Sequence, residues 1–208
     1  SITNIFNEYG EKRFRLIETA FFKECTKLNH NIYATGGGII LNKHNRFILK
    51  NKGTLCFDHF FFKCCIGKNS TTNNKIEGDK KTPKGNFSLG NLYYRKDRNS
   101  KPITNLKCVP IKKNMAWCND IRLKNKYNKL IYINKKINHE KMYRKDYKYD
   151  FVIPIKYNTK KIKLGKGSAI FIHLTKNYTP TAGCIALAKK DFLILLKVIK
   201  KNTKIKIN

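Results

Sequence analysis

The sequence has no run of about eighteen apolar residues, which is the minimum for a helix that crosses a lipid bilayer. It therefore predicts no membrane span. The N-terminus also lacks the basic start, apolar segment and small-residue cleavage site of a secretory signal peptide. As written, the chain is expected to be cytoplasmic.

Paired cysteine spacing is absent as well. The seven cysteines are an odd set without a C-x-x-C pair, which argues against both a disulfide framework and a zinc site. No metal and no cofactor are therefore expected. Cys56, Cys64 and Cys65 lie in apolar runs and are predicted to be small buried side chains.

Acidic side chains are scarce. Thirteen acidic residues stand against 45 basic ones, and the formal net charge is +32. Such a charge is typical of nucleic-acid-binding proteins, but here the lysines are scattered among abundant Asn and Ile. We therefore expect no nucleic-acid partner, and a non-enzymatic basic binding module stays open as an alternative function. A basic surface of either origin favours ligands rich in carboxylates.

The most informative stretch runs from Gly165 to Lys190. It contains an apolar, β-like segment with His173, a polar loop, and Cys184. A neighbouring imidazole can lower the pKa of a thiol or accept its proton. The loop is long enough for a turn and a return that brings the two side chains together. On spacing alone, a catalytic pair and a packed core pair both remain possible.

Gly183 comes directly before this cysteine, in T-A-G-C. A glycine lets the backbone turn tightly, so that successive N–H groups face a developing oxyanion. Gly183 is therefore a candidate catalytic-site residue through its backbone.

Four blocks of sequence resemble one family in the same order. The blocks are C-C-I-G-K-N-S, N-K-I-E-G-D-K-K-T-P-K-G-N-F-S-L, Y-D-F-V-I-P-I-K-Y-N, and I-F-I-H-L-T followed by T-A-G-C-I-A-L. Together they are similar to the L,D-transpeptidase catalytic domain, also called YkuD, over about residues 48–208. Members of this family are more often periplasmic or attached to the cell envelope.

The resemblance implies an acyl-transfer enzyme whose partners are peptidoglycan stem peptides. Cys184 would attack the third residue of a stem peptide, His173 would take the thiol proton, and the backbone near Leu174 would orient the imidazole. The resulting thioester would pass to an amine of a second stem peptide. Alternatively water would resolve it, as in a cytoplasmic L,D-carboxypeptidase of murein recycling.

Two positions depart from the family pattern. Most members carry a second His two residues before the nucleophile, where this chain has Ala182, and often an Arg or Asn two residues after it, where it has Ala186. The polar residue after the nucleophile commonly helps to hold the substrate in this family. Its replacement by Ala186 therefore leaves open which class of murein peptide this chain would use. The resemblance also makes Thr181, Trp117, Arg122 and Tyr149 candidate substrate-binding residues.

Residues 1–47 resemble a different family. S-I-T-N-I-F-N-E-Y-G-E-K-R-F-R-L-I-E and A-T-G-G-G are similar to the middle of shikimate kinase, where residues matching Arg15, Gly36, Gly37 and Gly38 line the substrate pocket. The chain contains no P-loop G-x-x-x-x-G-K-[ST], which the kinase needs for its nucleotide. We expect a non-catalytic fragment at 1–47, and a catalytic domain at 48–208.

The expected fold is mainly β with α+β character. It would be an L,D-transpeptidase-like β-sandwich with a C-terminal helix after residue 190, preceded by a helix–strand remnant of an α/β kinase that starts with a helix over 1–31. For the remaining polar candidates we predict structural positions and no chemical role. Glu77 and Asp79 are expected in a structural turn, His59 in a turn, and His139 in solvent.

Overall fold

The computed structural model describes residues 2–25, 53–57, 60–133 and 137–207. The chain divides into two compact units, residues 1–62 and 63–208. In the order of the chain the elements are α1 (Ile2–Cys25), β1 (Thr54–Phe57), β2 (Phe60–Cys65), β3 (Thr71–Thr72), β4 (Thr82–Pro83), β5 (Gly85–Ser88), β6 (Leu92–Tyr94), β7 (Cys108–Pro110), β8 (Met115–Cys118), β9 (Leu130–Tyr132), β10 (His139–Lys141), β11 (Phe151–Pro154), β12 (Phe171–Leu174), β13 (Ile185–Leu187), α3 (Lys189–Val198) and β14 (Lys204–Ile207).

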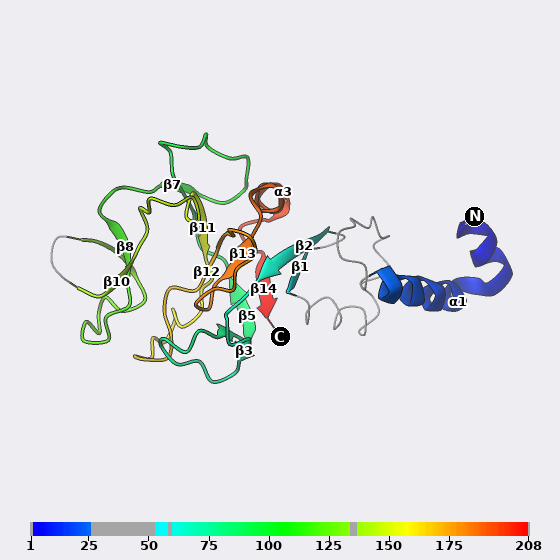
Figure 1. The fold of residues 1–208 in the computed structure, drawn as a ribbon, viewed down its shortest axis with the longest axis horizontal. Helices are drawn as coiled ribbons and strands as arrows, with labels where there is room; N and C mark the ends of the chain where they lie inside the picture. The colour runs from blue at the N-terminus through cyan, green and yellow to red at the C-terminus, as the bar shows by residue number, and fades with distance from the viewer. Residues whose placement is uncertain (1, 26–52, 58–59, 134–136, 208) are drawn as a thin grey trace. The chain divides into compact units, whose positions relative to one another are not determined.

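Strands dominate the unit at 63–208 (Figure 1), which confirms the mainly β class. The largest sheet has the order β1-β2-β13-β12-β11-β6-β7, and it is mixed, because β12 pairs with β13 in parallel and with β11 antiparallel. Every side chain of β11, β12 and β13 is buried. These central strands therefore lack the polar alternation of a strand with one face in solvent.

Two layers cover the faces of this sheet. On one face, Met115 of β8 packs into the same apolar cluster as Val152 of β11 and Phe171 of β12. On the other face, the ring of Phe192 in α3 stacks on Phe151 of β11, with 6.0 Å between ring centroids. The site described below lies on the first face, between the large sheet and the three-stranded sheet β10-β8-β9.

The C-terminal part of the chain agrees with the sequence prediction. Helix α3 has Asp191 in its first turn and Lys197 in its last, as the helix dipole favours. Strand β14 follows it and pairs antiparallel with β5. The helix buries Phe192, Leu195 and Leu196 against the sheet. It therefore supports the strands that carry the site by packing on the opposite face of the sheet.

Helix α1 is the described part of the predicted N-terminal helix. Gly10 interrupts it with a φ of 71° and a ψ of 168°, so two helical segments meet there at a kink. The predicted kinase-like glycines 36–38 and His59 lie outside the described residues. None of the described helices has the length and apolar character required to cross a bilayer.

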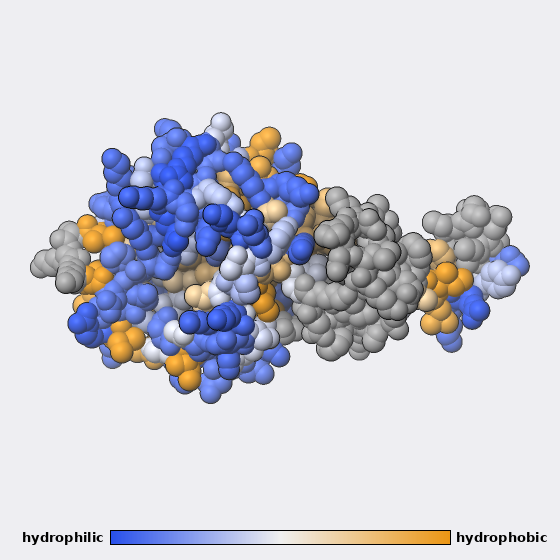
Figure 2. All heavy atoms as spheres, viewed as in Figure 1, coloured by the Kyte–Doolittle hydropathy of each residue, from blue (hydrophilic) through white to orange (hydrophobic). Residues whose placement is uncertain are grey.

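One sequence prediction about the cysteines needs correction. Cys64 and Cys65 are buried as predicted, but Cys56 is exposed, because it occupies a strand position that faces solvent. Figure 2 shows hydrophilic side chains over most of the visible face of residues 63–208, as expected from a chain with such a high net charge.

Because Phe192 is fully buried against the sheet, Phe192→Ala is expected to lower the free energy of unfolding by about 3–5 kcal/mol. Ile194→Ala on the exposed side of α3 is the matched control and should cost under about 1 kcal/mol. Urea unfolding followed by the fluorescence of Trp117, the single tryptophan, measures both. Equal losses would contradict the packing described.

Candidate active site

Strand pairing brings His173 and Cys184 to one face of the sheet. In the parallel pair of β12 and β13, His173 lies opposite Ala186. Side chains two residues apart on a strand share a face, so Cys184, two residues before Ala186, lies on the same face as His173. The two functional groups therefore come from neighbouring strands, and Cys184 is offset by two residues from the position directly opposite His173.

The backbone at Gly183 delivers Cys184 to this position. Gly183 has a φ of 136°, and a Cβ added there would come within 2.9 Å of the Lys81 carbonyl oxygen. Both facts require glycine. The Thr181 hydroxyl closes the turn, because it donates to the Cys184 carbonyl at 2.6 Å and accepts from the Gly183 N–H at 3.1 Å. The Gly183 N–H is thus engaged within its own loop.

The His173 imidazole is held in one tautomer. Its Nδ1 lies 2.8 Å from the Leu174 carbonyl oxygen, and since a carbonyl can only accept, Nδ1 carries the proton and Nε2 keeps its lone pair. The ring of Tyr149 packs against the imidazole with 5.2 Å between centroids. Burial, assisted by Lys148 and Arg144, lowers the pKa of His173 to about 4. The imidazole is therefore a neutral base at pH 7.

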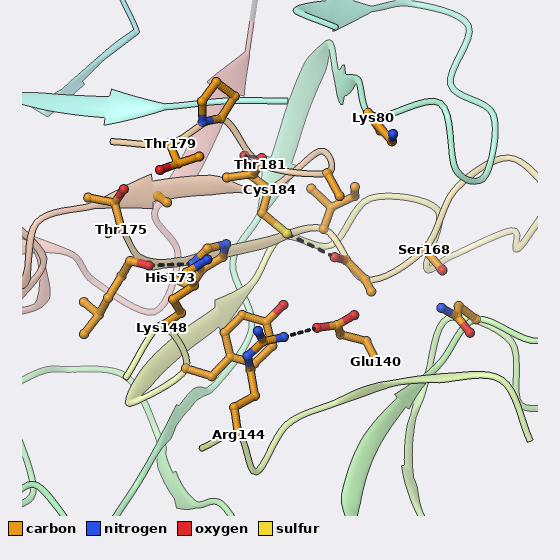
Figure 3. Close-up of a pocket in the computed structure, with 18 of the residues that line it drawn as sticks. Lys80, Glu140, Arg144, Lys148, Ser168, His173, Thr175, Thr179, Thr181 and Cys184 are labelled. Atoms are coloured by element: carbon orange, nitrogen blue, oxygen red, sulfur yellow. Dashed lines mark hydrogen bonds and ion pairs between the residues drawn. The ribbon is translucent and has the colours of Figure 1, made fainter. Parts of the chain in front are cut away.

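The Cys184 thiol donates to the Ala169 carbonyl at 3.3 Å and accepts from the Phe171 N–H at 3.4 Å. Burial raises its pKa to about 12. At rest the site thus holds a neutral thiol beside a neutral imidazole, not a thiolate–imidazolium pair. Figure 3 shows the sulfur pointing to the Ala169 carbonyl, with the His173 ring on its other side.

Both groups line one cavity of about 490 Å³. Cys184 is 8% exposed, so its sulfur is covered but borders this space. The charged side chains that line the cavity are Lys75, Lys80, Arg144, Lys148, Lys176, Glu77 and Glu140. Basic groups outnumber acidic ones, and the site therefore attracts anionic ligands such as carboxylates.

The predicted substrate-binding residues separate into two pairs. Thr181 and Tyr149 line the cavity with Cys184. Trp117 instead contacts Phe171 edge to face from the core and lines a second cavity of about 610 Å³. The Arg122 side chain is 72% exposed and forms an ion pair with Asp120 at 2.6 Å. Trp117 and Arg122 thus do not line the cavity that holds the thiol.

The other sequence candidates within the described residues have structural contacts of their own. In α1, Arg15 forms an ion pair with Glu11 at 3.2 Å. His139 is half-buried, with Nδ1 2.6 Å from the Ile137 carbonyl oxygen, so it is less exposed than expected. Asp79 accepts from the Ile76 and Lys81 N–H groups, in agreement with a structural turn.

Sequence reasoning missed the charged residues that surround the pair. Arg144 and Lys148 precede β11, and the antiparallel pairing of β11 with β12 brings them beside His173. Glu77 was assigned to a turn, and it lines the cavity as well. Arg144 and Lys148 lie outside the four family-like blocks, and only the strand pairing connects them to the thiol. Glu77 lies inside the second block, but that block alone did not connect it to the thiol.

Comparison with protein families decides the relationship. The model of the L,D-transpeptidase catalytic domain (YkuD) matches residues 37–207. The chain belongs to the L,D-transpeptidase family. The match starts ahead of the boundary expected near residue 48. No solved structure has significant similarity to the chain.

Part of the chain is also similar to shikimate kinases. It is 39% identical over 57 residues to that of Caldicellulosiruptor bescii, 48% over 52 residues to that of Staphylococcus epidermidis, and 40% over 58 residues to that of Neisseria gonorrhoeae. These segments are 25% to 28% of this chain and 30% to 43% of the relatives. Since fewer than 52 residues lie outside 37–207, the kinase-like segment overlaps the L,D-transpeptidase match.

Since burial raises the pKa of the Cys184 thiol to about 12, its alkylation by iodoacetamide should rise about tenfold per pH unit from pH 7 to pH 10. Mass spectrometry of the Cys184 peptide measures the rate. N-acetylcysteine is the reference and should level off above its ordinary pKa of about 8.5. A plateau for Cys184 below pH 8 would reveal a preformed thiolate and contradict the neutral resting pair.

The lowered pKa of His173 also links stability to pH. The unfolded state, with an ordinary pKa of 6.5, binds the proton more tightly than the folded state with a pKa of about 4. Stability from this group is therefore complete above pH 6.5 and is lost as the pH falls toward 4. Between pH 7 and 4.5, the wild-type protein should lose about 2–3 kcal/mol more than His173→Asn in urea unfolding. Equal losses would show that His173 is not buried.

Proposed function

We propose that the chain catalyses cysteine-dependent acyl transfer on peptidoglycan stem peptides, with Cys184 as nucleophile and His173 as base. The observation that carries this proposal is the shared cavity in which a thiol borders a neutral imidazole whose Nδ1 is fixed by the Leu174 carbonyl. An imidazole oriented in this way accepts a proton at Nε2. Membership in the L,D-transpeptidase family supports the choice of reaction.

In the first half of the reaction, the Cys184 sulfur forms a bond to the carbonyl carbon of the third residue of a stem peptide, while His173 Nε2 takes the thiol proton. The C–N bond to the departing D-alanine then breaks, and its nitrogen receives that proton. The acyl group stays on Cys184 as a thioester. Because the thiol has a raised pKa, proton removal accompanies the attack and does not precede it.

Binding of the donor is proposed to rest on the basic side chains of the cavity. Among the residues that the structure describes, Lys80, Lys148 and Lys176 line the cavity without an ion-pair partner. Lys148 is close enough to lower the pKa of His173. Its ammonium is therefore well placed for the carboxylate of a stem peptide whose scissile carbonyl meets Cys184. Thr181 and Tyr149 would line the same subsite.

The second half of the reaction has two possible outcomes at the same site. An amine of a second stem peptide gives a cross-link, and water gives the trimmed peptide of an L,D-carboxypeptidase. The kinase-like segment is proposed to take no part in either, since the chain has no P-loop. Mass spectrometry separates a joined dimer from a released tripeptide.

Cys184→Ala is expected to abolish both the labelling of the protein by a carbapenem and the turnover of a disaccharide-tetrapeptide, because the attacking sulfur is gone. His173→Asn should lower the acylation rate by about a hundredfold or more. Intact-protein mass spectrometry measures acylation.

Cys108→Ala is the matched control, since Cys108 is half-buried in β7 and does not line the cavity. It should retain acylation within about twofold. Turnover by Cys184→Ala would refute the proposal. Salt-dependent binding of acidic polymers without any turnover would instead support a basic binding module.

A further inference from the structure

Glu77 occupies the cavity without a role in the reaction described so far. Its Oε2 accepts two hydrogen bonds, from the Tyr127 hydroxyl at 2.5 Å and from the Ser168 hydroxyl at 2.7 Å. Tyr127 is fully buried, and burial together with Glu77 raises the pKa of this phenol above its ordinary value. The phenol therefore stays protonated and holds the carboxylate in one orientation.

The second oxygen of Glu77 is available to a ligand. Within the described part of the chain, neither an ion pair nor a hydrogen bond engages Oε1. The other carboxylates nearby differ in this respect, because Glu140 pairs with Arg144 at 3.2 Å and Asp79 pairs with Lys75 at 2.5 Å. Glu77 thus contributes a negative charge to the cavity that no described basic side chain neutralises through an ion pair.

Two consecutive residues connect Glu77 with the nucleophile. Ser168, which donates to Glu77, is followed directly by Ala169, whose carbonyl accepts from the Cys184 thiol at 3.3 Å. Consecutive Cα atoms are about 3.8 Å apart. Figure 3 shows Cys184 between His173 and Ser168. Glu77 therefore lines the same cavity as the thiol and is bonded to the residue that precedes Ala169.

The open oxygen of Glu77 suits a cation, although basic side chains predominate in the cavity as a whole. A carboxylate with one fixed and one open oxygen binds an ammonium through a charge-assisted hydrogen bond. An acidic ligand is repelled by Glu77 and attracted to Lys148 beside His173. Glu77 and Lys148 thus offer groups of opposite charge to ligands in the same cavity.

We propose that Glu77 binds the ammonium group of the acyl acceptor, a primary amine at the end of a flexible side chain, and takes its first proton. This assignment rests on the proposed function, because it concerns the fate of the thioester on Cys184. It makes the amine, and not water, the acceptor for which the site is built.

The step balances as follows. The bound ammonium gives one proton to Glu77 and becomes a neutral amine, which attacks the thioester carbonyl carbon. The new C–N bond forms, His173 takes the second proton from the nitrogen, and the C–S bond breaks. The Cys184 sulfur regains that proton from His173, and Glu77 releases its proton to solvent.

The test compares the fates of one thioester in the wild-type protein and in Glu77→Gln, which keeps the size of the side chain but removes its charge. Acylation of Cys184 by a tetrapeptide donor should be retained or rise, because the substitution removes a charge that repels an acidic donor. Aminolysis by a lysine-containing acceptor peptide should fall about tenfold or more, as expected for one charged hydrogen bond. The product ratio of joined dimer to tripeptide measures this loss.

Hydroxylamine, which is neutral at pH 7, provides the control within the same variant. Its reaction with the thioester should be the same in both proteins, and Glu77→Asp, which keeps the charge, should restore part of the aminolysis. An unchanged product ratio in Glu77→Gln, or an equal loss with hydroxylamine, would overturn the assignment. Failure of the wild-type protein to form any thioester would overturn the proposed function, and this assignment with it.

A second measurement needs no variant. Methylguanidinium is a cation that pairs with carboxylates through two N–H groups. Added to the wild-type protein, it should reduce aminolysis by the acceptor peptide several-fold and leave the hydroxylamine reaction unchanged. Equal inhibition of both reactions, or of neither, would count against a cation site at Glu77.

Discussion

The parallel alignment of β12 with β13 is the constraint on which the site depends. It sets His173 opposite Ala186 and so places Cys184 on the same face as the imidazole. A register shift of one residue would turn the thiol to the other face of the sheet. Gly183, with its positive φ and its backbone contact at Lys81, and the Thr181 hydroxyl fix where β13 begins. The chemistry thus follows from strand geometry and one tight turn.

Burial keeps both His173 and Cys184 in their neutral forms at rest. The same low-polarity surroundings lower the pKa of His173 to about 4 and raise that of Cys184 to about 12, because desolvation penalises the charged form of each group. A protonated thiol is a weak nucleophile, but it is also protected from adventitious oxidation. Activation then has to come from the arrival of substrate, when the imidazole and the attacked carbonyl share the movement of one proton.

The sequence predicted those features that depend on local pattern. The buried strands around His173 and Cys184, the helix that contains Asp191, and the short terminal strand all follow from periodicity and end signals. The surroundings of the thiol were not predictable in this way. Trp117 was expected near the substrate, but it is half-buried against the core and lines a different cavity. Lys148 and Glu77 reach the cavity of the thiol through strand pairing and a loop path that no spacing encodes.

The replacement of a polar residue by Ala186 becomes understandable from the same register. Ala186 lies between His173 on one neighbouring strand and Cys65 on the other, and a long side chain there would compete with the imidazole for the space beside the thiol. With alanine, charge reaches the cavity from outside the strand instead. Arg144 and Lys148 come from the segment before β11, and Lys176 follows β12. The loop between β3 and β4 contributes Glu77 together with Lys75 and Lys80. Recognition in this chain is therefore separated from the strands that carry the reacting pair, so loop changes can alter the substrate while the register preserves the chemistry.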